Sequence, residues 1–383
     1  EFKLINEIFG IEKGNEILLK QADIIKKHAV DGYLYGRVGE DHFVVIADED
    51  TFNEEYLYEC RETLQNVLSD SVYNVRVCFG IYRTDNMNES LSFMCDKASF
   101  AVASIKDDTH SFIAYYDDTM LEAAIKYKTI VDEFDDAIKA GEFKMYLQPQ
   151  ISAKTRRLTG AEALVRRIKP DGTIISPIDF IPVYEKSGLI SRLDRYIWEQ
   201  AAAKLGEWKK AGINMSISVN ISPKDFYYID IFNTFAGLIK KYDIEPSNLK
   251  IEITETTIMS DVPNLMGELE ELRKAGFTLE MDDFGSGYSS LNTLKDINVD
   301  VLKVDMGFIK ETKNVKKSRI ILASVIKMAK ELNLLIITEG VETEEQVDNL
   351  TKLGCDVFQG YYFSKAIDVN EFEKRYLYRK KAG

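Results

Sequence analysis

The sequence is poor in the residues on which several common kinds of site depend. Its three histidines, His28, His42 and His110, all precede residue 111, so the rest of the chain cannot supply a Ser-His-Asp triad or a histidine-ligated zinc ion. Its four cysteines form no Cys-x-x-Cys pair, which indicates reduced thiols and a cytoplasmic location. No apolar run approaches the roughly 20 residues of a membrane span, and no signal peptide is visible.

Positive charge is also scarce. The chain carries 49 Lys and Arg residues against 63 Asp and Glu residues, which gives a net charge of −14. Binding to DNA or RNA needs clustered positive charge, so this balance argues against both. It still allows a small anionic ligand if metal ions bring that ligand in. A length of 383 residues exceeds one ordinary core, so two domains are expected.

Proline is missing from the first third of the chain. All seven prolines lie at or after residue 149, and a long charged helical stretch covers residues 115–141. We therefore expect a first domain over residues 1–120 and a second domain, with its linker helix, over residues 121–383. The first residues read like the interior of a domain, so we expect the natural start, and any sensor or membrane tether, to lie upstream.

The second domain repeats a unit of strand and helix. Several of its helical patterns end in a glycine, such as Gly212, Gly276 or Gly354. Strands that alternate with helices predict a mainly parallel sheet, and eight such units in about 240 residues fit a closed (β/α)8 barrel. A doubly wound open sheet is the alternative, but it would want a GxGxxG turn after an early strand, and none is present. The eight apolar runs cover residues 144–151, 160–166, 216–222, 249–255, 278–283, 301–306, 334–339 and 356–363.

Polar residues lie towards the carboxyl ends of these runs. Strand side chains alternate between faces, so the apolar face should meet the outer helices and the polar face should point into the barrel. For any single residue a solvated strand end is a sufficient explanation. A barrel, however, would bring all of them to one mouth, where enzymes of this fold place their chemistry. The set comprises Glu162, Asn220, Glu252, Asp282, Asp283, Glu339 and Gln359.

These five carboxylates and two amides would repel one another with only Lys303 and Arg166 as cations. A pair of divalent ions resolves the imbalance, and ligation by oxygen alone suits Mg²⁺ or Mn²⁺. Two such ions about 3.5–4 Å apart suit the hydrolysis of a phosphodiester. Adjacent strand residues point to opposite faces, so we also expect the chain to leave strand geometry at Asp283.

Seven motifs occur in order in the second domain. "AEALVR", "VNIS", "EITE", "DDFGSGYSSL", "LKVD", "TEGVE" and "QGYYFSK" together resemble those of the EAL-domain phosphodiesterases, over roughly residues 125–378. That family hydrolyses the bacterial second messenger cyclic di-GMP to linear pGpG. The first domain resembles a GGDEF (diguanylate cyclase) domain more weakly. Together the resemblances imply a TIM-like barrel preceded by a smaller α/β domain, and a homodimer formed through the barrel.

The EAL resemblance implies roles for individual residues. Asp282 would serve mainly one metal ion and Asp283 the other. Glu339 resembles the residue that acts as general base or supports the activated water, and Lys303 would orient that water. The implied metal ligands are Glu162, Asn220, Glu252, Asp282, Asp283 and Glu339. The implied substrate contacts are Gln148, Arg166, Asp305 and Gln359, and the implied mobile loop and its support are Gly285, Ser286, Gly287 and Glu255.

Two positions depart from the EAL pattern. Arg167 stands where the family often has an aromatic residue, and Ala366 stands where a proline is usual. Neither is a ligand position, so we expect a changed affinity and retained activity.

The first domain departs further from its family. The segment "RVGEDHF" reads as a hairpin turn at the position of the GGDEF signature. Glu40 replaces the second glycine, whose missing side chain lets the backbone approach a phosphate, and His42 replaces an acid that would ligate Mg²⁺. We expect no cyclase activity, and a regulatory domain that binds GTP through Asn6. The signature positions that fit are Gly39, Asp41 and Phe43.

Three functional classes follow from these patterns. The first is an active, metal-dependent cyclic di-GMP phosphodiesterase. The second is a catalytically inactive EAL receptor that binds the dinucleotide and signals through protein contacts, and the third is a purely structural domain. Inactive members typically lose one or more acids, whereas every ligand-type position is intact here, which favours the first class.

Overall fold

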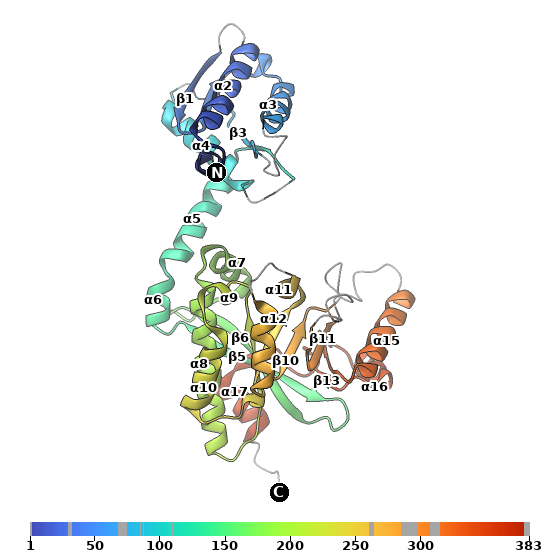
Figure 1. Ribbon diagram of the computed structural model, residues 1–383. Helices are drawn as coiled ribbons and strands as arrows, with labels where there is room; N and C mark the ends of the chain where they lie inside the picture. The colour runs from blue at the N-terminus through green and yellow to red at the C-terminus, as the bar shows by residue number, and fades with distance from the viewer. Residues whose placement is uncertain are drawn as a thin grey trace. The chain divides into compact units, whose positions relative to one another are not determined.

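The structure is a computed structural model of the 383-residue chain (Figure 1). It describes residues 2–29, 33–67, 75–84, 86, 88–106, 108, 110–259, 264–284, 294, 297–306 and 315–378. The chain forms two compact units, Glu1–Lys128 and Thr129–Gly383. The expected boundary at residue 120 lies inside helix α5 (Asp118–Asp132). Among the described helices, none is long and apolar enough to cross a membrane.

The first unit packs helices against two small sheets. Strands β1 and β2 form the expected antiparallel hairpin, with Gly39 opposite His42 at its tip. Strands β3 and β4 pair in parallel. The elements are α1 (Phe2–Phe9), α2 (Ile11–His28), β1 (Leu34–Gly39), β2 (His42–Ile46), the 3₁₀ helix η1 (Glu49–Thr51), α3 (Glu55–Asn66), β3 (Phe79–Ile81), α4 (Leu91–Ser104) and β4 (Ile113–Tyr115).

The charged helical stretch before the barrel is divided in two. Helices α5 and α6 (Phe134–Lys139) are separated by Glu133, and Gly141 follows with a φ of 66°. The Arg167 guanidinium on β6 donates to Glu133 at 2.7 Å and to Glu142 at 2.9 Å. Because Arg167 is buried, these two ion pairs fix both ends of α6 to the barrel. An arginine at this position therefore anchors the linker.

Eight strands of the second unit close into a barrel. Neighbouring strands from β6 to β13 run parallel, whereas β5 is antiparallel to both β6 and β13. Because β5 pairs on both sides, the expected closed barrel is confirmed and the open sheet is wrong. The strands are β5 (Phe143–Ser152), β6 (Leu158–Ile168), β8 (Ile217–Ile221), β9 (Leu249–Thr254), β10 (Leu279–Asp282), β11 (Val301–Asp305), β12 (Leu335–Glu339) and β13 (Val357–Phe358).

Helices cover the outside of the barrel, and α8, α10 and α12 lie next to one another there (Figure 1). The apolar strand residues, such as Val219, Ile251 and Leu302, are buried in one core with these helices, as the alternation predicted. The helical elements are α7 (Pro177–Ser187), α8 (Ile190–Lys210), α9 (Asp225–Tyr228), α10 (Ile231–Tyr242), η2 (Pro246–Asn248), α11 (Glu255–Met259), α12 (Leu265–Lys274), α15 (Val315–Glu331), α16 (Glu344–Leu353), α17 (Val369–Phe372) and the π-helix η3 (Glu373–Leu377). The short strands β7 (Ile174–Ile175) and β14 (Ile367–Asp368) extend the sheet.

The predicted helix ends are also confirmed. Gly212, Gly276 and Gly354 follow α8, α12 and α16 with φ values of 74°, 94° and 93°, a left-handed conformation that glycine adopts without a Cβ clash. They reverse the chain into the next strand.

Candidate active site

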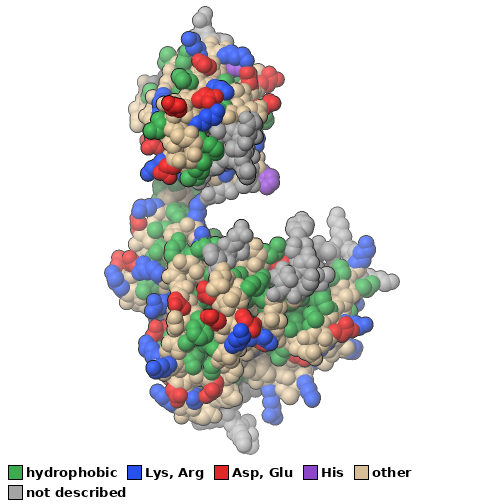
Figure 2. All heavy atoms as spheres, viewed as in Figure 1, with side chains coloured by type: hydrophobic (Ala, Val, Ile, Leu, Met, Phe, Trp, Pro, Cys, Tyr) green, Lys and Arg blue, Asp and Glu red, His purple; other side chains and the backbone are tan. Residues whose placement is uncertain are grey.

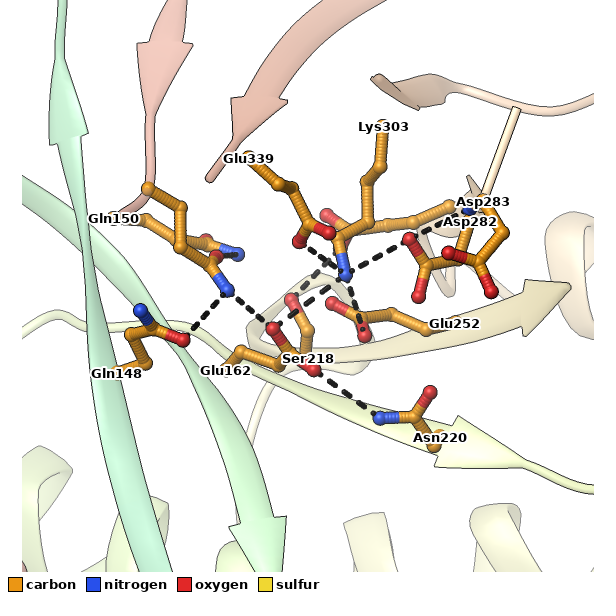
Figure 3. Close-up of polar contacts among 12 residues, drawn as sticks. Gln148, Gln150, Glu162, Ser218, Asn220, Glu252, Asp282, Asp283, Lys303 and Glu339 are labelled. Atoms are coloured by element: carbon orange, nitrogen blue, oxygen red, sulfur yellow. Dashed lines mark hydrogen bonds and ion pairs between the residues drawn. The ribbon is translucent and has the colours of Figure 1, made fainter. Parts of the chain in front are cut away.

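The carboxyl ends of the barrel strands bring the predicted polar residues together (Figure 3). Parallel register places Asn220 beside Glu252, and Asp305 beside Glu339. Antiparallel register places Gln148 beside Glu162. Except at Glu339, whose neighbours are Thr338 and Gly340, each of these side chains adjoins a buried apolar residue that faces the outer helices, so the polar set points inward.

Lys303 lies at the centre of this set. Its side chain is 0% exposed, and its Nζ atom lies 2.8 Å from Glu339, 2.9 Å from Glu252, 3.3 Å from Asp282 and 3.6 Å from Glu162. Burial by itself lowers the pKa of an ammonium, but the four surrounding carboxylates raise the pKa of Lys303 well above its ordinary value. Lys303 is therefore charged and serves as the counter-ion of the site.

Of the two carboxylates closest to Lys303, Glu252 is 0% exposed and Glu339 is 19% exposed. Burial, and then the charge of Glu162, raise the pKa of Glu252 well above its ordinary value. Burial also raises the pKa of Glu339 to about 8, although Lys303 opposes that change. Both Glu252 oxygens and Oε1 of Glu339 are buried, and Lys303 supplies the only ammonium within 4 Å of them among the described residues. One ammonium thus leaves the carboxylates of the site incompletely compensated.

A chain of amides closes the other side of the mouth. Gln359 Nε2 donates to Glu162 and, at 3.3 Å, to Gln148, and Gln359 accepts from Gln150 at 3.2 Å. Asn220 donates to the second oxygen of Glu162 at 3.4 Å. Gln150 is 1% exposed and was not among the predicted residues. Its position on β5, two residues after Gln148 and on the same face, is the signal that could have indicated it.

The two adjacent aspartates are separated by a change of backbone conformation. Strand β10 ends at Asp282, and Asp283 has a φ of 56°, which confirms the predicted departure from strand geometry. The Asp283 amide donates to the Asp282 carboxylate at 2.8 Å, and the Asp283 side chain is exposed. Gly285, Ser286 and Gly287 of the predicted loop lie outside the described residues.

The remaining predicted residues border the mouth. Arg166 follows Glu162 on the same face of β6, and its guanidinium lies 5.9 Å from the Tyr146 ring. Burial lowers the pKa of Arg166. Asp305 ends β11, and Glu255 is buried at the first position of α11.

A second ion pair lies deeper in the barrel. Lys250 Nζ is 2.9 Å from Glu280, which also accepts from the Ser218 hydroxyl at 2.8 Å. Burial would raise the pKa of Glu280, but Lys250 and Lys303 together lower it. None of these three residues was predicted, although Lys250 shares the polar face of its strand with Glu252. On the face shown in Figure 2, acidic and basic side chains are interspersed.

The donor set fits a hard divalent ion. Carboxylate and amide oxygens are the ligands that Mg²⁺ and Mn²⁺ prefer, and the oxygens of Glu252 and Glu339 share the single ammonium of Lys303. As they stand, however, no three acidic, histidine or cysteine side chains of the described residues are arranged to hold a metal ion. The ammonium of Lys303 lies among the carboxylates instead.

The GGDEF-like turn keeps its hairpin without its glycine. Glu40 has a φ of 30°, in the region that glycine tolerates best, and its carbonyl accepts from Arg37 Nε at 2.7 Å. His42 lies 3.3 Å from Asp41. The side-chain oxygen Oδ1 of Asn6 is buried and has no hydrogen-bond partner among the described residues.

The fold and site together define a TIM-barrel domain with an acidic site at the carboxyl ends of its strands. The EAL domain family matches residues 131–366, and the family described as diguanylate cyclase, GGDEF domain matches residues 1–111. The chain therefore belongs to the EAL domain family, with a GGDEF domain before the barrel.

Similar proteins match most of the length of this chain. Signaling protein YkoW of Bacillus subtilis is 31% identical over 379 residues, which is 97% of this chain and 47% of the relative. Bifunctional diguanylate cyclase/cyclic di-GMP phosphodiesterase MucR of Pseudomonas aeruginosa is 28% identical over 97% of this chain and 55% of the relative. The chain thus spans about half the length of these relatives. A solved structure, the PaMucR phosphodiesterase in complex with c-di-GMP, has 32% identity and a TM-score of 0.60 over 64% of this chain and 99% of its own.

Proposed function

We propose that the barrel hydrolyses cyclic di-GMP to linear pGpG with the help of two divalent metal ions. The observation that carries the proposal is the convergence of four carboxylates within 3.6 Å of one buried ammonium. A site with this excess of negative charge is suited to bind further cations. The name of the relative MucR and the c-di-GMP complex of a similar phosphodiesterase support this choice of substrate.

The ligands of the first ion would be Glu162, Asn220, Glu252 and Asp282. Asp283 would hold the second ion, because its left-handed backbone directs it away from Asp282, and Glu339 would support both. When bound, the ions supply positive charge that polarises the phosphodiester and lowers the pKa of the attacking water.

The residues of the chain would bind the substrate and move the proton. Arg166 would contact a phosphate, and Gln148, Asp305 and Gln359 would orient the dinucleotide in the mouth. The Glu339 carboxylate would take the proton that the attacking water loses. Water attacks phosphorus, one P–O bond to a ribose oxygen breaks, and that oxygen gains a proton. Lys303 would keep the carboxylates oriented during these steps. Glu255 would support the loop that begins after Phe284.

The proposal assigns the GGDEF domain a regulatory role without cyclase activity. Glu40 and His42 replace the glycine and the acid that cyclase activity requires at these positions. Asn6 would provide the contact to GTP. We further propose that the chain acts as a homodimer in the cytoplasm. Cyclic di-GMP synthesis from GTP by the purified protein would contradict the regulatory assignment.

An inactive cyclic di-GMP receptor is the competing function. It would use the same mouth but would not need all of its acids. Here the glutamates and aspartates are all present, and four of them lie within 3.6 Å of Lys303, which favours hydrolysis.

The test is an assay of pGpG formation by the full chain with Mg²⁺ or Mn²⁺. We expect turnover by the parent protein, loss of turnover in Glu162→Gln with cyclic di-GMP binding retained, and normal turnover in Glu331→Gln, an exposed control on α15. A parent protein that binds cyclic di-GMP but forms no pGpG with either metal would establish the receptor function instead.

A further inference from the structure

The barrel contains a second charged layer beneath the proposed metal site. Lys250, Glu280 and Ser218 come from the neighbouring strands β9, β10 and β8. Glu280 and Ser218 are 0% exposed, and the Lys250 side chain is 17% exposed. Glu280 accepts from both partners, at 2.9 Å from Lys250 and 2.8 Å from Ser218. We call these three residues the lower layer.

The lower layer is joined directly to a proposed ligand. Parallel register places Glu280 beside Glu252, and Lys250 precedes Glu252 by two residues on the same face of β9. Two residues of strand correspond to about 7 Å. The other half of the barrel interior near this depth is apolar, and it is formed by Val301, Ile337 and Val357. Among the described residues at this depth, the buried charges therefore lie on the side of the barrel that carries Glu252.

We propose that the lower layer balances charge beneath the metal site: Lys250 neutralises the Glu280 carboxylate, which lies beside Glu252, and the pair thereby sets the affinity of the site for a divalent cation. This inference rests on the proposed function, because it takes Glu252 as a metal ligand. Lys250 and Glu280 are positioning residues, since they act through Glu252 and touch neither metal nor substrate.

The two charges of the pair should act in opposite directions. Without Lys250, the negative charge of Glu280 is uncompensated beside Glu252, so the site attracts a divalent cation more strongly. Without Glu280, the positive charge of Lys250 remains about one layer below the site and repels the cation. A single charge at this distance in a protein interior changes a binding constant by about tenfold or more. A purely structural ion pair would show no such opposition.

The experiment measures Mn²⁺ binding to the full chain by electron paramagnetic resonance, together with urea unfolding and steady-state kinetics. Binding at the site is defined as the part that is lost in Glu252→Gln. We expect Lys250→Met to bind Mn²⁺ about tenfold more tightly and Glu280→Gln about tenfold more weakly. Both should unfold at lower urea concentration than the parent, because each leaves a buried charge unpaired. Both should also show a lower kcat, because Glu252 is displaced.

Two further variants separate charge balance from stability. Lys250→Met/Glu280→Met removes both charges while filling the space. We therefore expect its Mn²⁺ affinity to lie within about threefold of the parent value and its stability to be close to that of the parent. Lys204→Met is the matched control, because Lys204 belongs to a partly buried ion pair with Glu373 on the outer helices. It should lower stability and leave Mn²⁺ affinity unchanged.

The outcomes distinguish the inference from the function on which it rests. If the parent binds Mn²⁺ and forms pGpG, but Lys250→Met and Glu280→Gln change the affinity in the same direction or leave it unchanged, the charge-balancing role is wrong and the proposed function stands. If the parent binds no Mn²⁺ that Glu252→Gln removes, the metal site itself is wrong and both proposals fail.

Discussion

Replacing Asp225 by asparagine should stabilise the folded chain above pH 6. Asp225 is 0% exposed at the start of α9, and its Oδ2 atom accepts from the Ser222 amide at 2.8 Å. The carboxyl of Asp194 on α8 lies next to it, and the charge of Asp225 adds to burial in raising the pKa of Asp194. Two neighbouring carboxyls in a buried place cannot both be ionised without repulsion. Asparagine keeps the acceptor for Ser222 and removes one of the two charges.

The size of the effect follows from the pKa of Asp225. Burial raises this pKa from 3.8 to about 6, so the folded state binds the proton more tightly than the unfolded state does. Ionising the carboxyl therefore costs the folded state about 3 kcal/mol. That cost is fully present above the folded pKa of about 6, decreases as the pH falls, and disappears below the unfolded value of 3.8.

The assay compares unfolding of the parent and Asp225→Asn at pH 8, 6 and 4. For a unit of this size, about 3 kcal/mol corresponds to a rise in melting temperature of about 6–12 °C, which we expect at pH 8. The difference should shrink at pH 6 and vanish near pH 4. Stabilisation that does not change with pH, or destabilisation at pH 8, would refute the reasoning.

Three other predictions follow from single residues. Lys303→Met should lower the unfolding free energy of the metal-free protein by about 3–5 kcal/mol, because four carboxylates lose their counter-ion, and Mn²⁺ should restore part of the loss in a urea titration. Glu40→Gly should raise the stability of the first unit by about 0.5–1 kcal/mol in thermal unfolding, since Glu40 has a φ of 30°, and an unchanged or lower melting temperature would contradict this. Asp283→Ala and Asp283→Gly should both abolish pGpG formation, but only the alanine variant should lose about 1 kcal/mol of stability, because the backbone at 56° favours glycine.

The alternation of apolar and polar residues was enough to predict the barrel and most of its mouth. Val219 and Ile251 are buried against the outer helices. Because strand side chains alternate between faces, the neighbouring side chains Asn220 and Glu252 must point into the barrel. The glycine-ended helices then fix the direction of each following strand, so the carboxyl ends meet at one edge.

The interior below the mouth could not be predicted in the same way. Lys250 and Glu280 are 30 residues apart and pair only because the register of β9 and β10 brings them together. Alternation with Gln148 could have placed Gln150 on the inward face of β5, but its contact with the site depends on that strand running antiparallel to its neighbours. Strand register and direction depend on how the barrel closes, which local sequence patterns do not contain.

The buried ammonium of Lys303 has a consequence for folding of the chain in the absence of a metal ion. A cluster of buried carboxylates without a cation would oppose folding, so many acidic sites form only when their ion is present. Here the chain supplies one permanent positive charge from its own strand β11. Under the proposed function, folding of the barrel would thereby not require a metal ion, and metal binding to the already folded chain would activate it.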